Sequence, residues 1–152
     1  MLKLNYKKLL IKKNKIPITC LTAYSKPLAN ILDGKIDLIL IGDSLGTTLY
    51  GMQNTRGVTI EMMKNHGKAV VLNTKFSMTI IDMPYNTYRN KKEALKNALD
   101  ILAFTKADFI KIETDEKNID IVEHLTKNKI KVVSHIGVTP QKFSNFSRIK
   151  SV

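Results

Sequence analysis

The fold of this chain is decided by Ile39-Leu40-Ile41-Gly42-Asp43-Ser44-Leu45-Gly46, an apolar run that ends abruptly in an acid, a hydroxyl and two glycines. Similar endings follow three later apolar runs, at Asp82, at Lys111-Ile112-Glu113 and at Ser134-His135. Polar residues at the carboxyl ends of successive buried strands are how α/β barrels and open parallel sheets assemble their active sites. We therefore expect a functional site at this edge of a parallel sheet.

Strand-like and helix-like segments alternate along the chain with short connections, which is typical of a parallel α/β fold. We expect five strands, at residues 17–22, 36–41, 76–81, 109–112 and 130–133. Helices are expected at about 2–13, 25–33, 59–72, 90–104 and 119–127, with a helical turn at 140–143 and a loop at 42–58. Thr59 and Asn90 are predicted N-caps, and Gly34 suits a helix end. Residues 144–152 are polar and carry no strong signal of order.

Length and composition describe an ordinary globular protein. The 152 residues are enough for one domain, or a large part of one, with 43% hydrophobic and 25% charged residues. No apolar run approaches the roughly 20 residues that span a membrane, and the basic start has no cleavage site of the secretory type. The single cysteine, Cys20, lies in an apolar strand, so we expect it in the core of a cytoplasmic protein.

The net charge of +12 raises the question of a nucleic-acid partner. The cations are 22 lysines and only 3 arginines, and the lysines are scattered along the chain. Recognition of phosphates and bases favours the planar fork of arginine, so nucleic-acid binding is not expected. The charge would still attract anionic small molecules. A basic binding protein without catalytic activity remains the non-enzymatic alternative.

Three carboxylates, Asp43, Asp82 and Glu113, each follow an apolar strand and should point into the same mouth of the fold. Hard carboxylate oxygens in a partly open site suit Mg²⁺, with water or substrate in the remaining coordination positions. The alternative is structural: each acid could cap a helix or pair with a neighbouring lysine. Equivalent positions on three strands favour the functional interpretation.

Lys111 lies two residues before Glu113, so both side chains should lie on the same face of an extended strand. A lysine facing the interior needs an anion, and we expect a substrate carboxylate or Glu113 as its partner, unless it reaches solvent. Ser44 can donate a hydroxyl to an anion. His135 could orient a substrate or be structural, and His66 and His124 are expected on the surface.

The chain resembles the ketopantoate hydroxymethyltransferase (3-methyl-2-oxobutanoate hydroxymethyltransferase) family over nearly its whole length. The matching motifs, which are jointly specific in order and spacing, are Ile18-Thr19-Cys20-Leu21-Thr22-Ala23-Tyr24, Ile41-Gly42-Asp43-Ser44-Leu45-Gly46, Val58-Thr59 with His66, Asp82-Met83-Pro84, Glu93-Ala94, Lys111-Ile112-Glu113 and His135-Ile136-Gly137-Val138-Thr139-Pro140-Gln141. The resemblance implies a (β/α)₈ TIM barrel of the phosphoenolpyruvate mutase superfamily, with about the first five β/α units present in residues 1–152. Another metal-dependent lyase or mutase of that superfamily, acting on a different α-keto acid, is the alternative enzyme.

The implied reaction moves a one-carbon unit from 5,10-methylenetetrahydrofolate to 3-methyl-2-oxobutanoate in pantothenate synthesis. By the same resemblance, Mg²⁺ binds Asp43 and Asp82, and Glu113 completes the metal site. The resemblance also implies that the keto acid contacts Asp43, Ser44, Asp82 and Lys111, with His135 at the edge of the site. The family's general base is a glutamate on a later strand, beyond Val152, so no residue here is assigned that role.

The chain departs from the family pattern in several places. Ser25 stands where aspartate is usual, Thr55-Arg56-Gly57 replaces Thr-Leu-Pro, and Thr114-Asp115 replaces a glycine pair. A complete barrel takes about 250 residues. We therefore expect a truncated or split gene product, in preference to a chain that forms a homo-oligomer or joins a complementing C-terminal chain, or a decayed homologue. Alone, it should bind metal and keto acid weakly and turn over poorly.

Overall fold

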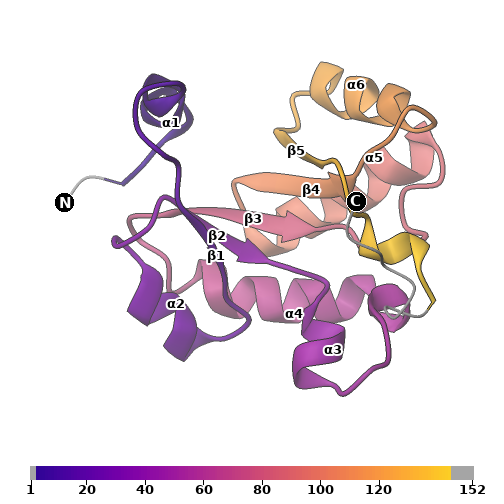
Figure 1. The fold of residues 1–152 in the computed structure, drawn as a ribbon, viewed down its shortest axis with the longest axis horizontal. Helices are drawn as coiled ribbons and strands as arrows, with labels where there is room; N and C mark the ends of the chain where they lie inside the picture. Colours follow the sequence, from indigo (N-terminus) through magenta and orange to yellow (C-terminus); the bar gives the residue numbers. More distant parts are fainter. Residues whose placement is uncertain (1–2, 145–152) are drawn as a thin grey trace.

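The computed structural model describes residues 3–144, and its centre is a five-stranded sheet. The strands are β1 (Cys20–Thr22), β2 (Leu38–Ile41), β3 (Met78–Asp82), β4 (Phe109–Glu113) and β5 (Val132–His135). All neighbouring strands are parallel, and their spatial order, β1-β2-β3-β4-β5, follows the sequence (Figure 1). This is the strand order of successive β/α units in a barrel, and it confirms the predicted α/β fold.

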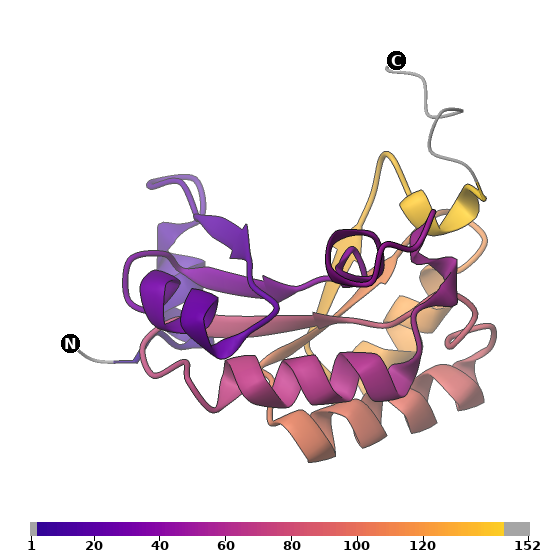
Figure 2. The ribbon, with the colours of Figure 1, turned by 90° about the horizontal axis from the view of Figure 1, so that it is seen from below.

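Helices that follow the strands form a layer on the outer face of the sheet. They are α2 (Lys26–Leu32), α4 (Ile60–Val71), α5 (Lys91–Thr105) and α6 (Ile119–Lys127). In Figure 2, α4 and α5 lie side by side across this face. The main core lies between the two layers, where β2, β3 and β4 contribute buried isoleucines: Ile39, Ile41, Ile81, Ile110 and Ile112. Parallel strands covered in this way are expected to be apolar on the helix side.

Local sequence signals fix where these helices begin and end. The Thr59 hydroxyl accepts a hydrogen bond from Met62 N (3.2 Å), and Asn90 Oδ1 accepts one from Glu93 N (2.9 Å). Both side chains are therefore the N-caps that the sequence predicts. After α2, Gly34 has φ of 80°, the left-handed conformation that glycine adopts without strain.

The inner face of the sheet is covered only in part. Helix α1 (Tyr6–Lys12) contributes the buried Leu9, which packs with Met78, Ile80 and Phe109 in a second, smaller core. At the edge strand β1 all three residues are exposed, so the prediction that Cys20 is a core residue is wrong. The strand has no partner beyond it among the described residues, and nothing described covers its inner side.

Two other sequence predictions need correction. The expected loop at 42–58 contains α3 (Leu45–Leu49) and the 3₁₀-helix η1 (Thr55–Gly57), which begins where Asn54 Oδ1 accepts a hydrogen bond from Arg56 N (3.0 Å). Strand β5 begins and ends two residues later than predicted. Ile130 instead closes α6, because its N–H donates to Leu125 O (3.1 Å). The other boundaries agree within a few residues, and the predictions for residues 1–2 and 145–152 lie outside the described residues.

No helix among residues 3–144 combines the length and the apolar character that crossing a membrane demands.

Candidate functional site

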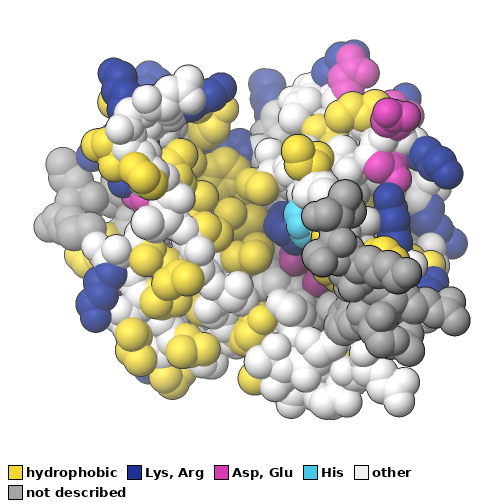
Figure 3. Space-filling model, in the orientation of Figure 1, with side chains coloured by type: hydrophobic (Ala, Val, Ile, Leu, Met, Phe, Trp, Pro, Cys, Tyr) yellow, Lys and Arg dark blue, Asp and Glu magenta, His cyan; other side chains and the backbone are white. Residues whose placement is uncertain are grey.

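Strand register and side-chain alternation place four of the predicted site residues on the inner face. Asp82 and Lys111 are register partners on β3 and β4, and Glu113 and His135 are partners one step further along β4 and β5. Since residues two apart share a face, Lys111 and Glu113 point the same way, as predicted. Charged side chains gather near the middle of the face in Figure 3, next to a broad apolar area over the strands.

An ion pair forms the buried part of the site. Lys111 Nζ lies 2.5 Å from Asp82 Oδ1, and the Asp82 side chain is only 3% exposed. The other Asp82 oxygen accepts a hydrogen bond from Asp43 N (3.1 Å). The protein partner of Lys111 is therefore Asp82, whereas the sequence predicted a substrate carboxylate or Glu113. The reason is the register: Asp82 lies directly beside Lys111, and Glu113 lies in the next row.

Burial and mutual repulsion raise the pKa values of the three carboxylates. Burial raises the pKa of Asp82 to about 6 despite the Lys111 charge, and the nearby Asp43 adds to the rise. Burial also raises the pKa of Glu113 to about 7, with the charges of Asp43 and Asp82 contributing. The pKa of Asp43 is raised as well, chiefly by burial. Negative charge is thus crowded into a poorly solvated place, and a bound cation would relieve it.

Gln141, on the 3₁₀-helix η2 (Pro140–Lys142), connects two of these carboxylates. Its backbone N–H faces both Glu113 oxygens (3.1 and 3.2 Å), and its side-chain amide donates to Asp43 Oδ2 (2.7 Å) and to Met83 O (3.0 Å). Tyr88 in turn donates its hydroxyl to Gln141 Oε1 (2.5 Å). No role was predicted for Gln141 from the sequence, although the turn that begins at Pro140, five residues after His135, was a usable signal.

Ser44 has a protein partner that the sequence analysis also missed. The hydroxyls of Ser44 and Tyr24 lie 2.7 Å apart, so Tyr24 can fix the direction of the serine side chain. His66 was predicted on the surface but is half-buried: its Nδ1 lies 2.7 Å from Tyr24 O, and its Nε2 lies 2.9 Å from the Tyr50 hydroxyl. It therefore supports the segment that carries Tyr24. His124, the other predicted surface histidine, is also half-buried, on α6.

Two buried polar atoms near the carboxylates have no hydrogen-bond partner among the described residues, Thr55 Oγ1 and His135 Nδ1. Burial, together with the Lys111 charge, lowers the pKa of His135 and so favours the neutral ring. A neutral imidazole can donate from one nitrogen and accept at the other. Both groups therefore keep hydrogen-bonding capacity that a ligand could use.

The carboxylates at this edge of the sheet are oxygen donors of the kind that Mg²⁺ binds. Asp43 and Asp82 supply hard oxygens, and Mg²⁺ typically binds one or two carboxylates and fills its other positions with water and substrate oxygens. Within residues 3–144, no three His, Cys, Asp or Glu side chains are grouped as a ready metal centre. The crowded negative charge fits a cation at Asp43 and Asp82, and the part of Glu113 in such a site stays a prediction.

Parallel strands in sequential order, outer helices and acids at the carboxyl ends of the strands define an α/β protein of the barrel type. The sequence matches the family described as ketopantoate hydroxymethyltransferase over residues 3–152. The chain belongs to the ketopantoate hydroxymethyltransferase family.

Curated relatives bear the name 3-methyl-2-oxobutanoate hydroxymethyltransferase. The protein of Pelagibacter ubique is 53% identical over 135 residues, which cover 89% of this chain and 52% of the relative. That of Rhizobium etli is 45% identical over 137 residues (90% and 50%), and that of Brucella canis is 40% identical over 141 residues (92% and 51%). The chain spans about half the length of the curated relatives it matches.

Proposed function

We propose that this chain supplies the metal- and keto-acid-binding half of a 3-methyl-2-oxobutanoate hydroxymethyltransferase site. The reaction would transfer a hydroxymethyl group from 5,10-methylenetetrahydrofolate to 3-methyl-2-oxobutanoate and give 2-dehydropantoate. The observation that carries the proposal is the buried Lys111–Asp82 pair beside Asp43 at the carboxyl end of the sheet. The relatives' shared name supports the choice of substrate.

In this proposal each residue has one task. Asp43 and Asp82 hold Mg²⁺, with Glu113 as the third acid of the site, and the bound ion supplies Lewis-acid stabilisation of charge that develops on the keto oxygen. Lys111 offsets the charge of the substrate carboxylate. The Ser44 hydroxyl, directed by Tyr24, donates a hydrogen bond to the keto acid.

Proton removal from C3 of the keto acid is not assigned to any residue of this chain. Lys111 is engaged with Asp82, and the neutral His135 lies at the edge of the site with one nitrogen unpartnered. We therefore expect the 152-residue chain to bind the keto acid and to exchange its C3 proton much more slowly than a complete enzyme does.

Calorimetry of 3-methyl-2-oxobutanoate binding with and without Mg²⁺ tests the proposal. Saturable, Mg²⁺-dependent binding that disappears in Asp82→Ala would support it. The matched control is Asp100→Ala, because Asp100 is an exposed acid that pairs with Lys64 (3.1 Å) on the outer helices. Absence of binding by a wild-type chain that is folded by circular dichroism would contradict the proposal.

Assembly and location belong to the same proposal. The exposed β1 edge, which includes the apolar Leu21, and the nearby Ile18 would be covered either by a second copy of the chain or by a complementing C-terminal chain. Light scattering of the purified chain measures the first possibility directly. The free, exposed Cys20 is compatible with a reducing compartment, and we place the protein in the cytoplasm.

A further inference from the structure

A buried hydroxyl beside the carboxylates has no hydrogen-bond partner. Thr55, on η1, is only 2% exposed, and its Oγ1 forms no hydrogen bond with any atom of residues 3–144. A hydroxyl left unpaired in the interior costs free energy, and nearly all buried polar side chains in native proteins have a partner. An unpaired hydroxyl at this position therefore indicates a partner that the chain itself does not supply.

Thr55 lies close to Asp43. Burial raises the pKa of Asp43, and the side chains of Gln141 and Thr55 act against this rise. Gln141 does so through a completed hydrogen bond to Asp43 Oδ2 (2.7 Å), whereas Thr55 comes near without completing one. Among the described residues, the other Asp43 oxygen, Oδ1, accepts no hydrogen bond. The unpaired hydroxyl is therefore next to a carboxylate that the proposed function assigns to Mg²⁺.

The backbone around Thr55 is fixed at both ends. Before it, Asn54 Oδ1 accepts a hydrogen bond from Arg56 N (3.0 Å). After it, Val58 is buried and packs so closely on α3 that a Cβ on Gly46 would lie 2.6 Å from Val58 Cγ2. The Thr55 side chain is thus held in place by its backbone and not by a contact of its hydroxyl.

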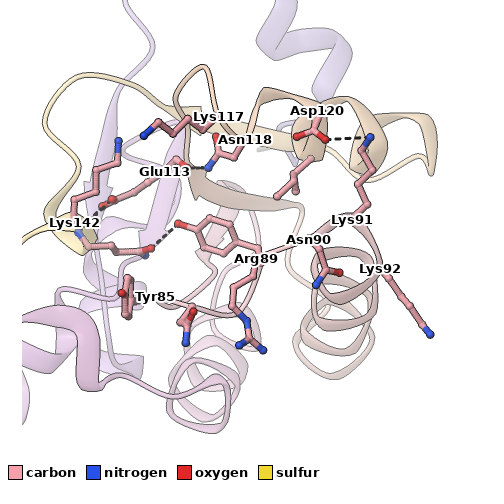
Figure 4. A pocket seen from close by; sticks show the side chains of 14 residues that line it. Tyr85, Arg89, Asn90, Lys91, Lys92, Glu113, Lys117, Asn118, Asp120 and Lys142 are labelled. Carbon is pink, nitrogen blue, oxygen red and sulfur yellow. Dashed lines mark hydrogen bonds and ion pairs between the residues drawn. The ribbon is translucent and has the colours of Figure 1, made fainter.

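Arg56 adds a third attachment. Its guanidinium carbon lies 4.2 Å from the centre of the Tyr85 ring, and Arg56 also donates to the Tyr85 hydroxyl. Tyr85 lines a pocket of about 630 Å³ together with Glu113 and Gln141 (Figure 4). Through Arg56, η1 is therefore tied to the chain that directly follows Asp82.

The chemistry of the site indicates which partner the hydroxyl takes. Mg²⁺ gives up its water ligands reluctantly, so a site with one or two carboxylates keeps several cation-bound waters. Water on a cation is polarised and donates strong hydrogen bonds. A neutral hydroxyl accepts from such a water without adding to the negative charge that Asp43, Asp82 and Glu113 already crowd together.

We propose that Thr55 is a positioning residue of the cation site, whose hydroxyl accepts a hydrogen bond from a water molecule on the cation bound by Asp43. The proposal rests on the proposed function, since that function supplies the cation. It assigns Thr55 a role that costs the cation-free chain stability, because the hydroxyl is buried unpaired until the cation binds. Stability and cation affinity should therefore respond to loss of this hydroxyl in opposite directions.

The variant that tests the proposal is Thr55→Val, which keeps the shape of the side chain and removes the hydroxyl. The Mg²⁺ affinity of the 152-residue chain, measured by calorimetry without keto acid, should fall about fivefold or more, since contacts to the ligands of a metal tune its affinity. The urea midpoint without divalent cations should stay the same or rise, because an unpaired buried hydroxyl is removed. Thr55→Ser keeps the hydroxyl and should retain most of the Mg²⁺ affinity.

The matched control is Thr105→Val at the end of α5. Thr105 is equally buried (1% exposed), but its hydroxyl donates to Ile101 O (2.7 Å) and accepts from Ala107 N (3.2 Å). This control should lower the urea midpoint and leave Mg²⁺ affinity unchanged. Equal Mg²⁺ affinity of wild type and Thr55→Val, or a lower urea midpoint in Thr55→Val, would overturn the role of Thr55 and leave the proposed function standing. No Mg²⁺ binding by the folded wild-type chain would overturn both.

Discussion

Asp33 at the amino end of the sheet is half-buried and Asp82 at the carboxyl end is buried, and their surroundings differ. At the amino end, Asp33 accepts hydrogen bonds from the backbone N–H groups of Lys75, Phe76 and Ser77 (2.7, 2.9 and 2.8 Å). Burial acts to raise the pKa of Asp33, but these bonds outweigh it and the pKa is lowered. At the carboxyl end, burial and neighbouring acids raise the pKa of Asp82 to about 6.

The difference separates structural from functional carboxylates. Asp33 uses both of its oxygens to hold the chain that enters β3, so its charge is already stabilised by backbone N–H groups. The acids at the carboxyl end repel each other, and either protonation or a bound cation reduces that repulsion. In barrels the carboxyl ends of the strands carry the chemistry and the amino ends carry stability. The lowered pKa of Asp33 and the raised pKa of Asp82 reflect this division between stability and chemistry.

Among substitutions that test this difference, the largest loss of stability is expected for Asp33 at the amino end of the sheet. Asp33→Ala removes the acceptor of three backbone N–H groups and should lower the free energy of unfolding by about 3 kcal/mol, at about 1 kcal/mol for each bond. Asp33→Asn keeps one carbonyl acceptor and should cost less. Urea denaturation followed by circular dichroism measures both. Equal stability of wild type and Asp33→Ala would remove the structural role assigned to this acid.

The pH dependence of the free energy of unfolding should reflect the carboxylates at both ends of the sheet. The raised pKa values of Asp82 (about 6) and Glu113 (about 7) mean that the folded chain holds these protons more tightly, so their contribution is lost as pH rises from about 4 to 7. The lowered pKa values of Asp33 and Asp37 act oppositely, and their contribution is lost as pH falls below about 3.8. We expect a fall of about 2 kcal/mol between pH 6 and pH 8, measured without divalent cations.

A flat profile between pH 5 and pH 8 would contradict the charge crowding. Addition of Mg²⁺ at pH 8 should recover part of the lost stability, because a ligand that binds only the folded state stabilises it, by about 1.4 kcal/mol at ten times its Kd. The same addition at pH 5 should do less, since protonated acids bind the cation poorly.

Substitution of Glu113 tests the charge crowding at the carboxyl end directly. Glu113→Gln removes one of the crowded charges but keeps an oxygen to accept the Gln141 N–H, so it should raise the free energy of unfolding at pH 8 by about 1 kcal/mol. Its pH profile should also be flatter than that of the wild type. Glu123→Gln, at an exposed acid paired with Lys127 on α6, is the control and should change stability by less than about 0.5 kcal/mol.

Much of the fold was predictable because its signals are local. Thr59 and Asn90 cap their helices as the sequence indicates, and period-two alternation places Lys111 and Glu113 on one face. The short helix α3 was not predictable in the same way. Its sequence, Leu-Gly-Thr-Thr-Leu, has low helix propensity, and the fully buried Leu45 indicates that tertiary packing fixes it.

The site was predictable in composition but not in its contacts. The register between β3 and β4 makes Asp82 the partner of Lys111, and no local pattern reveals a register between strands. Gln141 reaches Asp43 across 98 positions of sequence, so only the folded chain brings them together. His66 and Tyr24, 42 positions apart, meet for the same reason.

The smallest expected effect concerns one hydroxyl. Tyr24→Phe removes the hydrogen bond to Ser44 while keeping the buried ring, so the free energy of unfolding should fall by about 1 kcal/mol or less. If the Tyr24 hydroxyl directs Ser44 toward the keto acid, affinity for 3-methyl-2-oxobutanoate should fall about threefold to fivefold, the equivalent of about 1 kcal/mol. Ser77→Ala at the amino end removes a hydroxyl that donates to Ile36 O (2.7 Å) and accepts from Gly34 N (3.1 Å), and it should lower stability without changing keto-acid affinity. Equal losses of affinity in the two variants would mean that binding follows overall stability, and the two ends of the sheet would then not be functionally separate.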